Sequence, residues 1–207
     1  MEQEMKYSIP NKETADAIWE DAQHSECTDL NTAEPVVMKA VYFDTPDHAL
    51  TNSNLTLRIR AEGERCIATV KWGGCVSNGF HQKEEINVPV EGDISFINPS
   101  VDIFRGCEVG DKLLELTEGK QLINLLETRF LRRRLRLNYQ GNLIELSVDT
   151  GNVVTDNGEV PIQELELELY VGQAESVVEL GQKMAEQYGL SPKDSSKFAD
   201  GIALLNK

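Results

Sequence analysis

The sequence predicts an α+β fold in which about eight antiparallel strands are flanked by helices. Three observations predict it. Many short runs alternate apolar and charged residues, compact turn segments join several of these runs, and helical segments lie near the two ends of the chain. A sheet of this size can close into a barrel, which removes its edge strands.

Length and composition are those of one globular domain. The chain has 207 residues, of which 40% are hydrophobic and 27% charged, and we expect a single domain over residues 1–207. No apolar run approaches the ~20 residues that cross a bilayer, and the start has no signal-peptide pattern. The four cysteines are scattered, which suits reduced thiols. We therefore expect a cytoplasmic location, no membrane partner, and a monomer or homodimer.

The charge balance limits the classes of partner. There are 35 acidic against 20 basic residues, a formal net charge of −15. Such a surface repels nucleic acid and anionic membranes, so neither is an expected partner. It would also repel a small polyanion, unless the bases are gathered in an internal site.

The first half of the chain reads as strands broken by one helix. In MEQEMKYS, Glu2, Glu4 and Lys6 share one face of a predicted strand, because side chains alternate between faces. Asn11 suits the N-cap of a helix over residues 12–23. There follow a strand in VVMKAVYFD, a turn in DTPDHAL, a hairpin in LTLRIRAEGERCIATVKW, a loop in GGCVSNG and a strand in HQKEEINVPV.

The second half begins with loops and short helices over residues 93–127, the clearest helix being predicted at 119–126. TRFLRRRLRLNY and LIELSVDTGNVV then form a hairpin around a turn at residues 140–142, and VPIQELELELYV is a further strand. An amphipathic helix over residues 175–188 is closed by Gly189, and a short helix follows at 195–205.

The alternating strands each have a charged face. A sheet with one wet side accounts for the acids, but less easily for bases that gather on a few strands. With that face turned into a closed barrel, the interior would hold two poles, suited to a polyphosphate held by cations and a divalent metal held by carboxylates. The bases are Arg58, Arg60, Lys71, Lys83, Arg132 and Arg134, and the acids are Glu2, Glu4, Glu164 and Glu166.

With these residues in place, the chain resembles the CYTH domains, also called triphosphate tunnel metalloenzymes. The opening MEQEMK matches their ExExK motif. The resemblance continues in order through YFDTPD, LTLRIR, TVKWGG, FHQKEEINV, TRFLRRRLRL, IELSVDTGNV, PIQELELEL and DSSKFADG. The HQK-E-N segment and the ELELEL strand are most similar to the inorganic triphosphatase branch. Members of that branch often carry a second, helical domain, which we do not expect within these 207 residues.

The resemblance implies an eight-stranded antiparallel closed β-barrel, a tunnel, with flanking helices. It also implies hydrolysis of inorganic triphosphate to diphosphate and phosphate with Mg²⁺ or Mn²⁺, for which we expect two ions. Glu4, Lys6, Arg58, Lys71 and Glu85 are the expected catalytic residues. The expected metal ligands are Glu2, Glu4, Asp149, Glu164 and Glu166. The expected phosphate ligands are Lys6, Arg58, Arg60, Lys71, Lys83, Arg132, Arg134 and Lys197.

Two positions depart from the pattern of the family. Asn87 stands where many members have an acid, which could shift the metal preference or leave the tunnel more positive. The acid contributed by IELSVD is ambiguous between Glu145 and Asp149, because both lie in the inward register. We favour Asp149.

Other activities remain open at this point. Related domains cyclise ATP or hydrolyse thiamine triphosphate, and a non-catalytic module that binds polyphosphate or a nucleotide is a further alternative. Cyclisation needs a wall for adenine, and the sequence identifies none, since Trp19, Trp72 and Phe80 are more typical of packing. His81 shares the face of Lys83 and could touch substrate, although a hydrogen-bonded structural role is more common.

Overall fold

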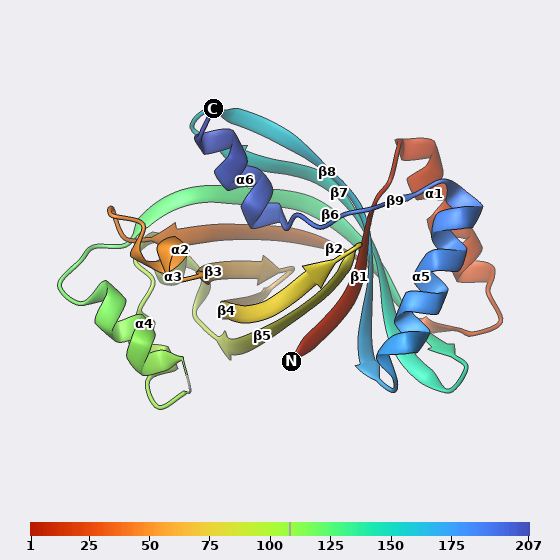
Figure 1. Cartoon of the computed structure of the whole chain (residues 1–207), viewed down its shortest axis with the longest axis horizontal. Coiled ribbons are helices and arrows are strands. Elements are labelled where there is room, and N and C mark those ends of the chain that lie inside the picture. The colour runs from red at the N-terminus through yellow and green to blue at the C-terminus, as the bar shows by residue number, and fades with distance from the viewer. Residues whose placement is uncertain (108) are drawn as a thin grey trace.

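Eight long antiparallel strands close on themselves in the computed structural model of the protein, which describes residues 1–107 and 109–207 (Figure 1). Around the ring they follow the order β5-β4-β3-β2-β6-β7-β8-β1, and β1 pairs with β5 to complete the barrel. Their bounds are β1 Glu2–Ser8, β2 Thr28–Asp44, β3 Leu55–Glu62, β4 Arg65–Ser77, β5 Phe80–Pro89, β6 Ile123–Tyr139, β7 Asn142–Thr155 and β8 Gly158–Val171. The closed α+β barrel expected from the sequence is confirmed.

The seam between β1 and β5 is short. It joins Glu2–Met5 to Phe80–Lys83, and beyond it the two-residue strand β9 (Ser191–Pro192) pairs with Tyr7 and Ser8 of β1. The chain that follows β9 therefore begins at the seam, beside the charged end of β1.

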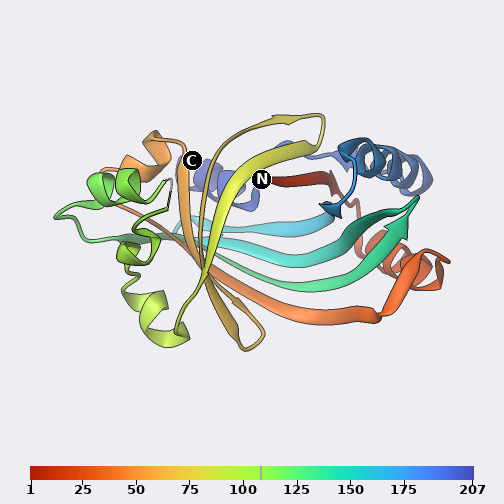
Figure 2. The same ribbon diagram turned by 90° about the horizontal axis from the view of Figure 1, so that it is seen from below.

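Helices cover the outside of the barrel and one side of its opening (Figure 2). Asn11 caps the first helix as expected, since its side chain accepts a hydrogen bond of 2.8 Å from the backbone N–H of Thr14. Gly189, at a φ of 64°, closes the fifth. The helices are α1 Lys12–His24, α2 Ala49–Asn52, α3 Gly92–Ile97, α4 Gly110–Thr117, α5 Ala174–Tyr188 and α6 Lys197–Leu205, with a 3-10 turn at Val101–Phe104.

Two predictions about local structure were wrong. The segment GGCVSNG is mostly strand, because β4 runs on to Ser77 through a bulge between Trp72 and Cys75. Gly74 makes this possible, because a Cβ there would lie 1.8 Å from the carbonyl oxygen of Gln82. The helix predicted at 119–126 is also absent. Its apolar residues begin β6, where pairing with β2 overrides the local helical pattern.

The apolar residues of the strands face outward and form the cores beneath the helices. On one side, α1 and α5 bury residues such as Ile18 and Val177 against Leu135, Leu146 and Leu167 of the barrel. On the other, Phe104 and Leu113 pack against Leu57, Ile59 and Val70. Because side chains alternate, this packing turns the charged register of every strand into the barrel.

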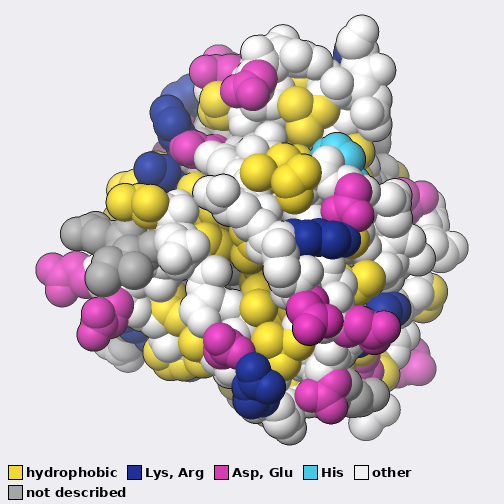
Figure 3. Space-filling model, turned by 90° about the vertical axis from the view of Figure 1, so that its left-hand side faces the viewer, with side chains coloured by type: hydrophobic (Ala, Val, Ile, Leu, Met, Phe, Trp, Pro, Cys, Tyr) yellow, Lys and Arg dark blue, Asp and Glu magenta, His cyan; other side chains and the backbone are white. Residues whose placement is uncertain are grey.

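The third core lies at one end of the barrel, under α6. Phe198 and Ile202 pack there with Met38, Tyr42 and Phe130, whose strands otherwise line the interior. The ring centroids of Tyr42 and Phe198 are 5.4 Å apart. On the outer face shown in Figure 3, acidic and basic side chains occur in separate small groups without an extended patch of one sign. Among the described residues, no helix is long and apolar enough to span a membrane.

Candidate active site

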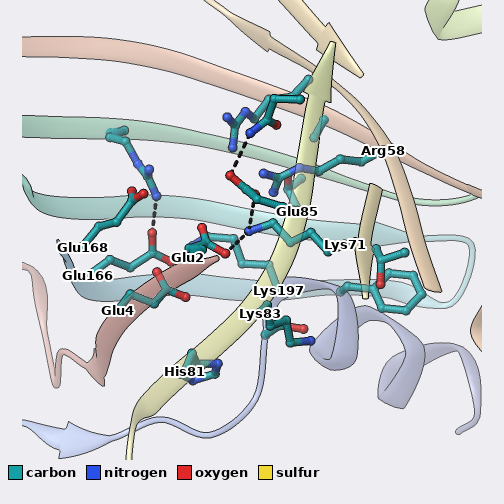
Figure 4. Close-up of a pocket in the computed structure, with 18 of the residues that line it drawn as sticks. Glu2, Glu4, Arg58, Lys71, His81, Lys83, Glu85, Glu166, Glu168 and Lys197 are labelled. Atoms are coloured by element: carbon teal, nitrogen blue, oxygen red, sulfur yellow. Dashed lines mark hydrogen bonds and ion pairs between the residues drawn. The ribbon is translucent and has the colours of Figure 1, made fainter. Parts of the chain in front are cut away.

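The barrel encloses a cavity of about 330 Å³ to which all eight long strands and the start of α6 contribute (Figure 4). The sequence-predicted residues that line it are Glu2, Glu4, Lys6, Arg58, Arg60, Lys71, Lys83, Glu85, Arg132, Arg134, Glu166 and Lys197. The remaining two, Asp149 and Glu164, lie behind the wall and are essentially inaccessible to solvent. Strand alternation thus brings one set of ionic side chains together from segments far apart in the chain.

On β3 and β5, Arg58 and Lys83 face the cavity without carboxylate partners among the described residues. Arg58 contacts only the hydroxyl of Tyr42, at 3.5 Å, and Lys83 forms no ion pair. The Nε atoms of Arg58 and Arg60 are buried without hydrogen-bond partners. Burial and the neighbouring Arg58 lower the pKa of Arg60 to about 10, although Glu62 pairs with it. Arg58 and Lys83 lack anionic partners among the described residues, and an anion in the cavity would supply one.

Glu85 lies among these bases and is held by hydrogen bonds. Its carboxylate is 3.0 Å from Lys71 Nζ, and Lys71 also pairs with Glu2. Asn87 donates a 2.7 Å hydrogen bond to Glu85 and accepts one of 2.7 Å from Thr69. Although burial opposes it, the charges of Lys71 and Arg58 lower the pKa of Glu85. Asn87 therefore orients Glu85 without adding charge.

Glu2 and Glu4 of β1 face the cavity together with Glu166 and Glu168 of β8 (Figure 4), and we call Glu2, Glu4 and Glu168 the tunnel trio. Glu4 and Glu168 are directly opposed across the strand pair. Glu168 has no hydrogen bond or ion pair with any residue the structure describes. Burial, together with the charges of Glu2 and Glu4, raises the pKa of Glu168 to about 8. Burial also raises the pKa of Glu4, although Lys6 opposes the shift.

Lys6 stands between this trio and a second group of acids. Its Nζ is 3.1 Å from both Glu4 and Glu166, and its side chain is almost fully buried. Burial lowers the pKa of Lys6, but Glu166 and Glu4 outweigh it and raise that pKa well above its ordinary value. Lys6 is thus a fixed cation at the wall.

Asp149, Glu164 and Glu166 form the buried trio. They offer oxygen atoms within 4.8 Å of one another, a buried acidic cluster consistent with metal binding. The ammonium of Lys197 lies between them, 2.6 to 2.8 Å from each. Burial alone would raise the pKa of Glu166. The charges of Lys197, Lys6 and Arg132 outweigh burial and hold that pKa well below its usual range. Asp149 is covered by Arg132 and Lys197, whereas Glu145 lines the cavity and accepts a 2.9 Å hydrogen bond from Tyr170.

The sequence prediction missed several cavity residues. Glu168 was recognisable, since it continues the inward register of the ELELEL strand. Tyr42, Phe130 and Phe198 carry no such signal, because aromatic residues on strands and helices usually pack in cores. His81 is buried, and its Nε2 is 2.8 Å from the carbonyl oxygen of Lys193. Since a carbonyl only accepts, this nitrogen carries the hydrogen.

The tunnel trio fits a divalent cation. Carboxylate oxygens are the ligands that Mg²⁺ and Mn²⁺ prefer. Glu168 is a largely buried carboxylate with no cationic partner among the described residues, and it lies beside two further acids. A bound cation would supply the charge that this corner of the tunnel lacks.

The comparisons with known proteins agree with this architecture. The CYTH domain family matches residues 1–202. An inorganic triphosphatase from Haemophilus influenzae is 29% identical over 166 residues, which are 80% of this chain and 45% of that protein, so the chain spans less than half of its relative. A Hippeastrum protein studied as an adenylyl cyclase, with a dominant triphosphatase activity, superposes with a TM-score of 0.72 at 19% identity, covering 98% of this chain and 96% of the other. A Bacillus halodurans protein described as an adenylate cyclase candidate superposes with a TM-score of 0.58 at 19% identity. The match covers 95% of this chain and 96% of the other.

Proposed function

The chain belongs to the CYTH domain family, and on that premise we propose that it hydrolyses inorganic triphosphate to diphosphate and phosphate with Mg²⁺ or Mn²⁺. The observation that supports this proposal is that basic and acidic side chains in the same tunnel both lack partners of opposite charge. Arg58 and Lys83 have no carboxylate partner among the described residues, and Glu168 opposite them has no cationic one. A metal–triphosphate complex supplies both missing charges.

Each pole has its own task in this proposal. Arg58, Arg60 and Lys83 would bind the phosphate oxygens, because guanidinium groups match them in pairs and an ammonium acts as a point charge. Glu85 and Asn87 would hold Lys71 toward the phosphates. Fixed cations of this kind stabilise the charge that moves onto the bridging and terminal oxygens during phosphoryl transfer.

The metal would be held by Glu2, Glu4 and Glu168. When bound, a divalent cation supplies charge neutralisation and lowers the pKa of a coordinated water. In the overall reaction one water adds to the terminal phosphorus and one P–O–P bond breaks, leaving phosphate and diphosphate. The protein has little covalent chemistry to perform, so rigid placement of its charges accounts for most of the catalysis.

A panel of phosphate-release assays tests the function. Tripolyphosphate, ATP and thiamine triphosphate are compared with Mg²⁺, Mn²⁺, Ca²⁺ and a chelator. We expect release from tripolyphosphate to be fastest and to stop with the chelator. Faster turnover of thiamine triphosphate, or cyclic AMP from ATP, would replace the proposed substrate. Binding of tripolyphosphate without phosphate release in any metal would identify a non-catalytic binding module.

A further inference from the structure

The ammonium of Lys197 lies within ion-pair distance of all three carboxylates of the buried trio. Its Nζ is 2.8 Å from Asp149 Oδ2, 2.6 Å from Glu164 Oε2 and 2.8 Å from Glu166 Oε1. Two of these contacts are hydrogen bonds, to Glu164 and Glu166, and the contact with Asp149 is an ion pair without hydrogen-bond geometry. The side chain is only 8% exposed. Although Lys197 borders the cavity, its ammonium is already enclosed by three carboxylates.

The other oxygens of the trio also face cations. Arg132 binds both oxygens of Asp149, at 2.8 and 2.7 Å, and contacts Glu166 Oε2. Lys193 Nζ lies 2.9 Å from Glu164 Oε1, as an ion pair without hydrogen-bond geometry. Three carboxylates thus face four cations, because Lys6 also pairs with Glu166. Nothing in this charge balance calls for a divalent ion.

The source of these cations matters for the fold. Lys193 directly follows β9, which is joined to the barrel seam, and Lys197 is the first residue of α6. The backbone N–H of Lys193 donates to Lys6 O at 2.9 Å, and Asp194 accepts a 2.6 Å hydrogen bond from the N–H of Gly79. Lys193 also pairs with Asp200 of α6, at 2.6 Å. The segment between β9 and α6 therefore holds Lys197 in a fixed place relative to β1, β5 and β8.

We propose that Lys197 is a positioning residue that occupies the buried trio in place of a metal ion and so fixes Glu166 and Arg132 in the tunnel wall. Asp149 and Glu164 then hold Lys197 and Arg132, and the divalent cation is left to Glu2, Glu4 and Glu168. The inference rests on the proposed function for the identity of that cation. It reassigns two predicted metal ligands and one predicted phosphate ligand to a structural ion network.

A matched pair of isosteric variants tests the inference. Asp149→Asn removes one carboxylate charge from the buried trio, and Glu168→Gln removes one from the tunnel trio. The dissociation constant for Mn²⁺ is measured by calorimetry without substrate, after circular dichroism has shown that each variant is folded. We expect Asp149→Asn to change this constant by less than about twofold, because Arg132 and Lys197, the partners of Asp149, form no ion pair with the tunnel trio among the described residues. Glu168→Gln should weaken binding by at least about tenfold.

The opposite pattern overturns the proposal: Mn²⁺ binding weakened about tenfold by Asp149→Asn, with Glu168→Gln near wild type.

An experiment on the unaltered protein avoids any loss of folding in the variants. Lysines are labelled with an amine-reactive reagent, with and without tripolyphosphate, and located by mass spectrometry. We expect Lys197 to stay unreactive in both conditions, because its ammonium is enclosed, and Lys83 to be protected by tripolyphosphate. Labelling of Lys197 in the free protein that tripolyphosphate then blocks would make it a phosphate ligand and contradict the proposal. This result is independent of catalysis, so a failure of the proposed hydrolase activity is seen separately, in the phosphate-release assays.

Discussion

The tunnel trio and the buried trio contain the same kind of group in opposite electrostatic states. Glu2 and Glu4 pair with Lys71 and Lys6, but Glu168 has no ion pair among the described residues, and burial and its acidic neighbours raise the pKa of Glu168 to about 8. In the buried trio, Lys197, Lys6 and Arg132 lower the pKa of Glu166 although burial opposes them. Both groups come from the inward register of adjacent strands.

The difference shows what a carboxylate needs in order to be available to a ligand. Oxygens that are already paired with Arg or Lys contribute to the stability of the protein, and removing a partner leaves a buried charge uncompensated. Oxygens without such partners lower the stability of the free protein but can bind an added cation. Comparing the two trios therefore separates positions where substitution should reduce activity from positions where it should reduce stability.

The largest expected effect comes from Glu4. We expect Glu4→Gln to lower kcat/KM for tripolyphosphate by on the order of 10³-fold, because it removes a charge from the proposed metal site. Thermal unfolding should change little, because Lys6 keeps its ion pair with Glu166 and the like-charged neighbour of Glu168 is removed. Glu159→Gln, at an exposed position of the neighbouring β8, is the matched control. Activity near wild type in Glu4→Gln would remove the tunnel trio from the reaction.

Substitution in the buried trio should affect stability first. Asp149→Asn is expected to lower the free energy of unfolding by about 3 kcal/mol, measured by urea denaturation, because Arg132 and Lys197 lose a buried partner. Glu34→Gln removes the exposed partner of Arg134 and should lower the free energy of unfolding by less than about 1 kcal/mol. Equal effects of the two substitutions would mean that the buried network adds no stability beyond a surface ion pair.

The opposite pole is tested by Arg58. Arg58→Ala should reduce kcat/KM by on the order of 10²-fold, because a fixed cation is lost from the position expected to face the phosphates. Arg129→Ala, on β6 but exposed and paired with Glu127, should leave the rate unchanged. If Arg129→Ala reduces the rate as much as Arg58→Ala, general surface charge rather than the tunnel explains the effect.

The smallest expected effect is a gain in stability. At a pH above about 8, where Glu168 is ionised, Glu168→Gln should raise the free energy of unfolding of the metal-free protein by about 0.5 kcal/mol, because two like charges that face each other across a strand pair repel. The measurement is made with a chelator, and added Mn²⁺ should then stabilise the wild type more than the variant. A loss of stability in the chelated variant would show that Glu168 has a cationic partner in solution.

Most of the barrel was predictable because period-two alternation does not depend on which strands pair. The inward register of Arg58 and Arg60, or of Glu164 and Glu166, follows from local sequence alone. Where the local sequence pattern and the available strand pairing favoured different structures, the strand pairing determined the structure. Residues 119–126 were predicted as helix, yet β6 begins within them because β2 provides a partner.

The state of each acid was not predictable, because it depends on residues distant in the sequence. Glu164 and Glu168 share one register of one strand, but only Glu164 meets Lys193 and Lys197. Those lysines reach it because the segment after β9 is joined to the barrel seam, and no sequence pattern indicates that contact. The inward register of Glu168 is visible in the sequence, but its lack of an ion-pair partner among the described residues shows only in three dimensions.

The two trios are compared most directly by crystals of the protein grown with Mn²⁺, using anomalous scattering to locate the ion. We expect a peak bounded by Glu2, Glu4 and Glu168, with Lys197 still enclosed by the other three acids. A peak among Asp149, Glu164 and Glu166, with Lys197 displaced, would contradict the separation of the two groups.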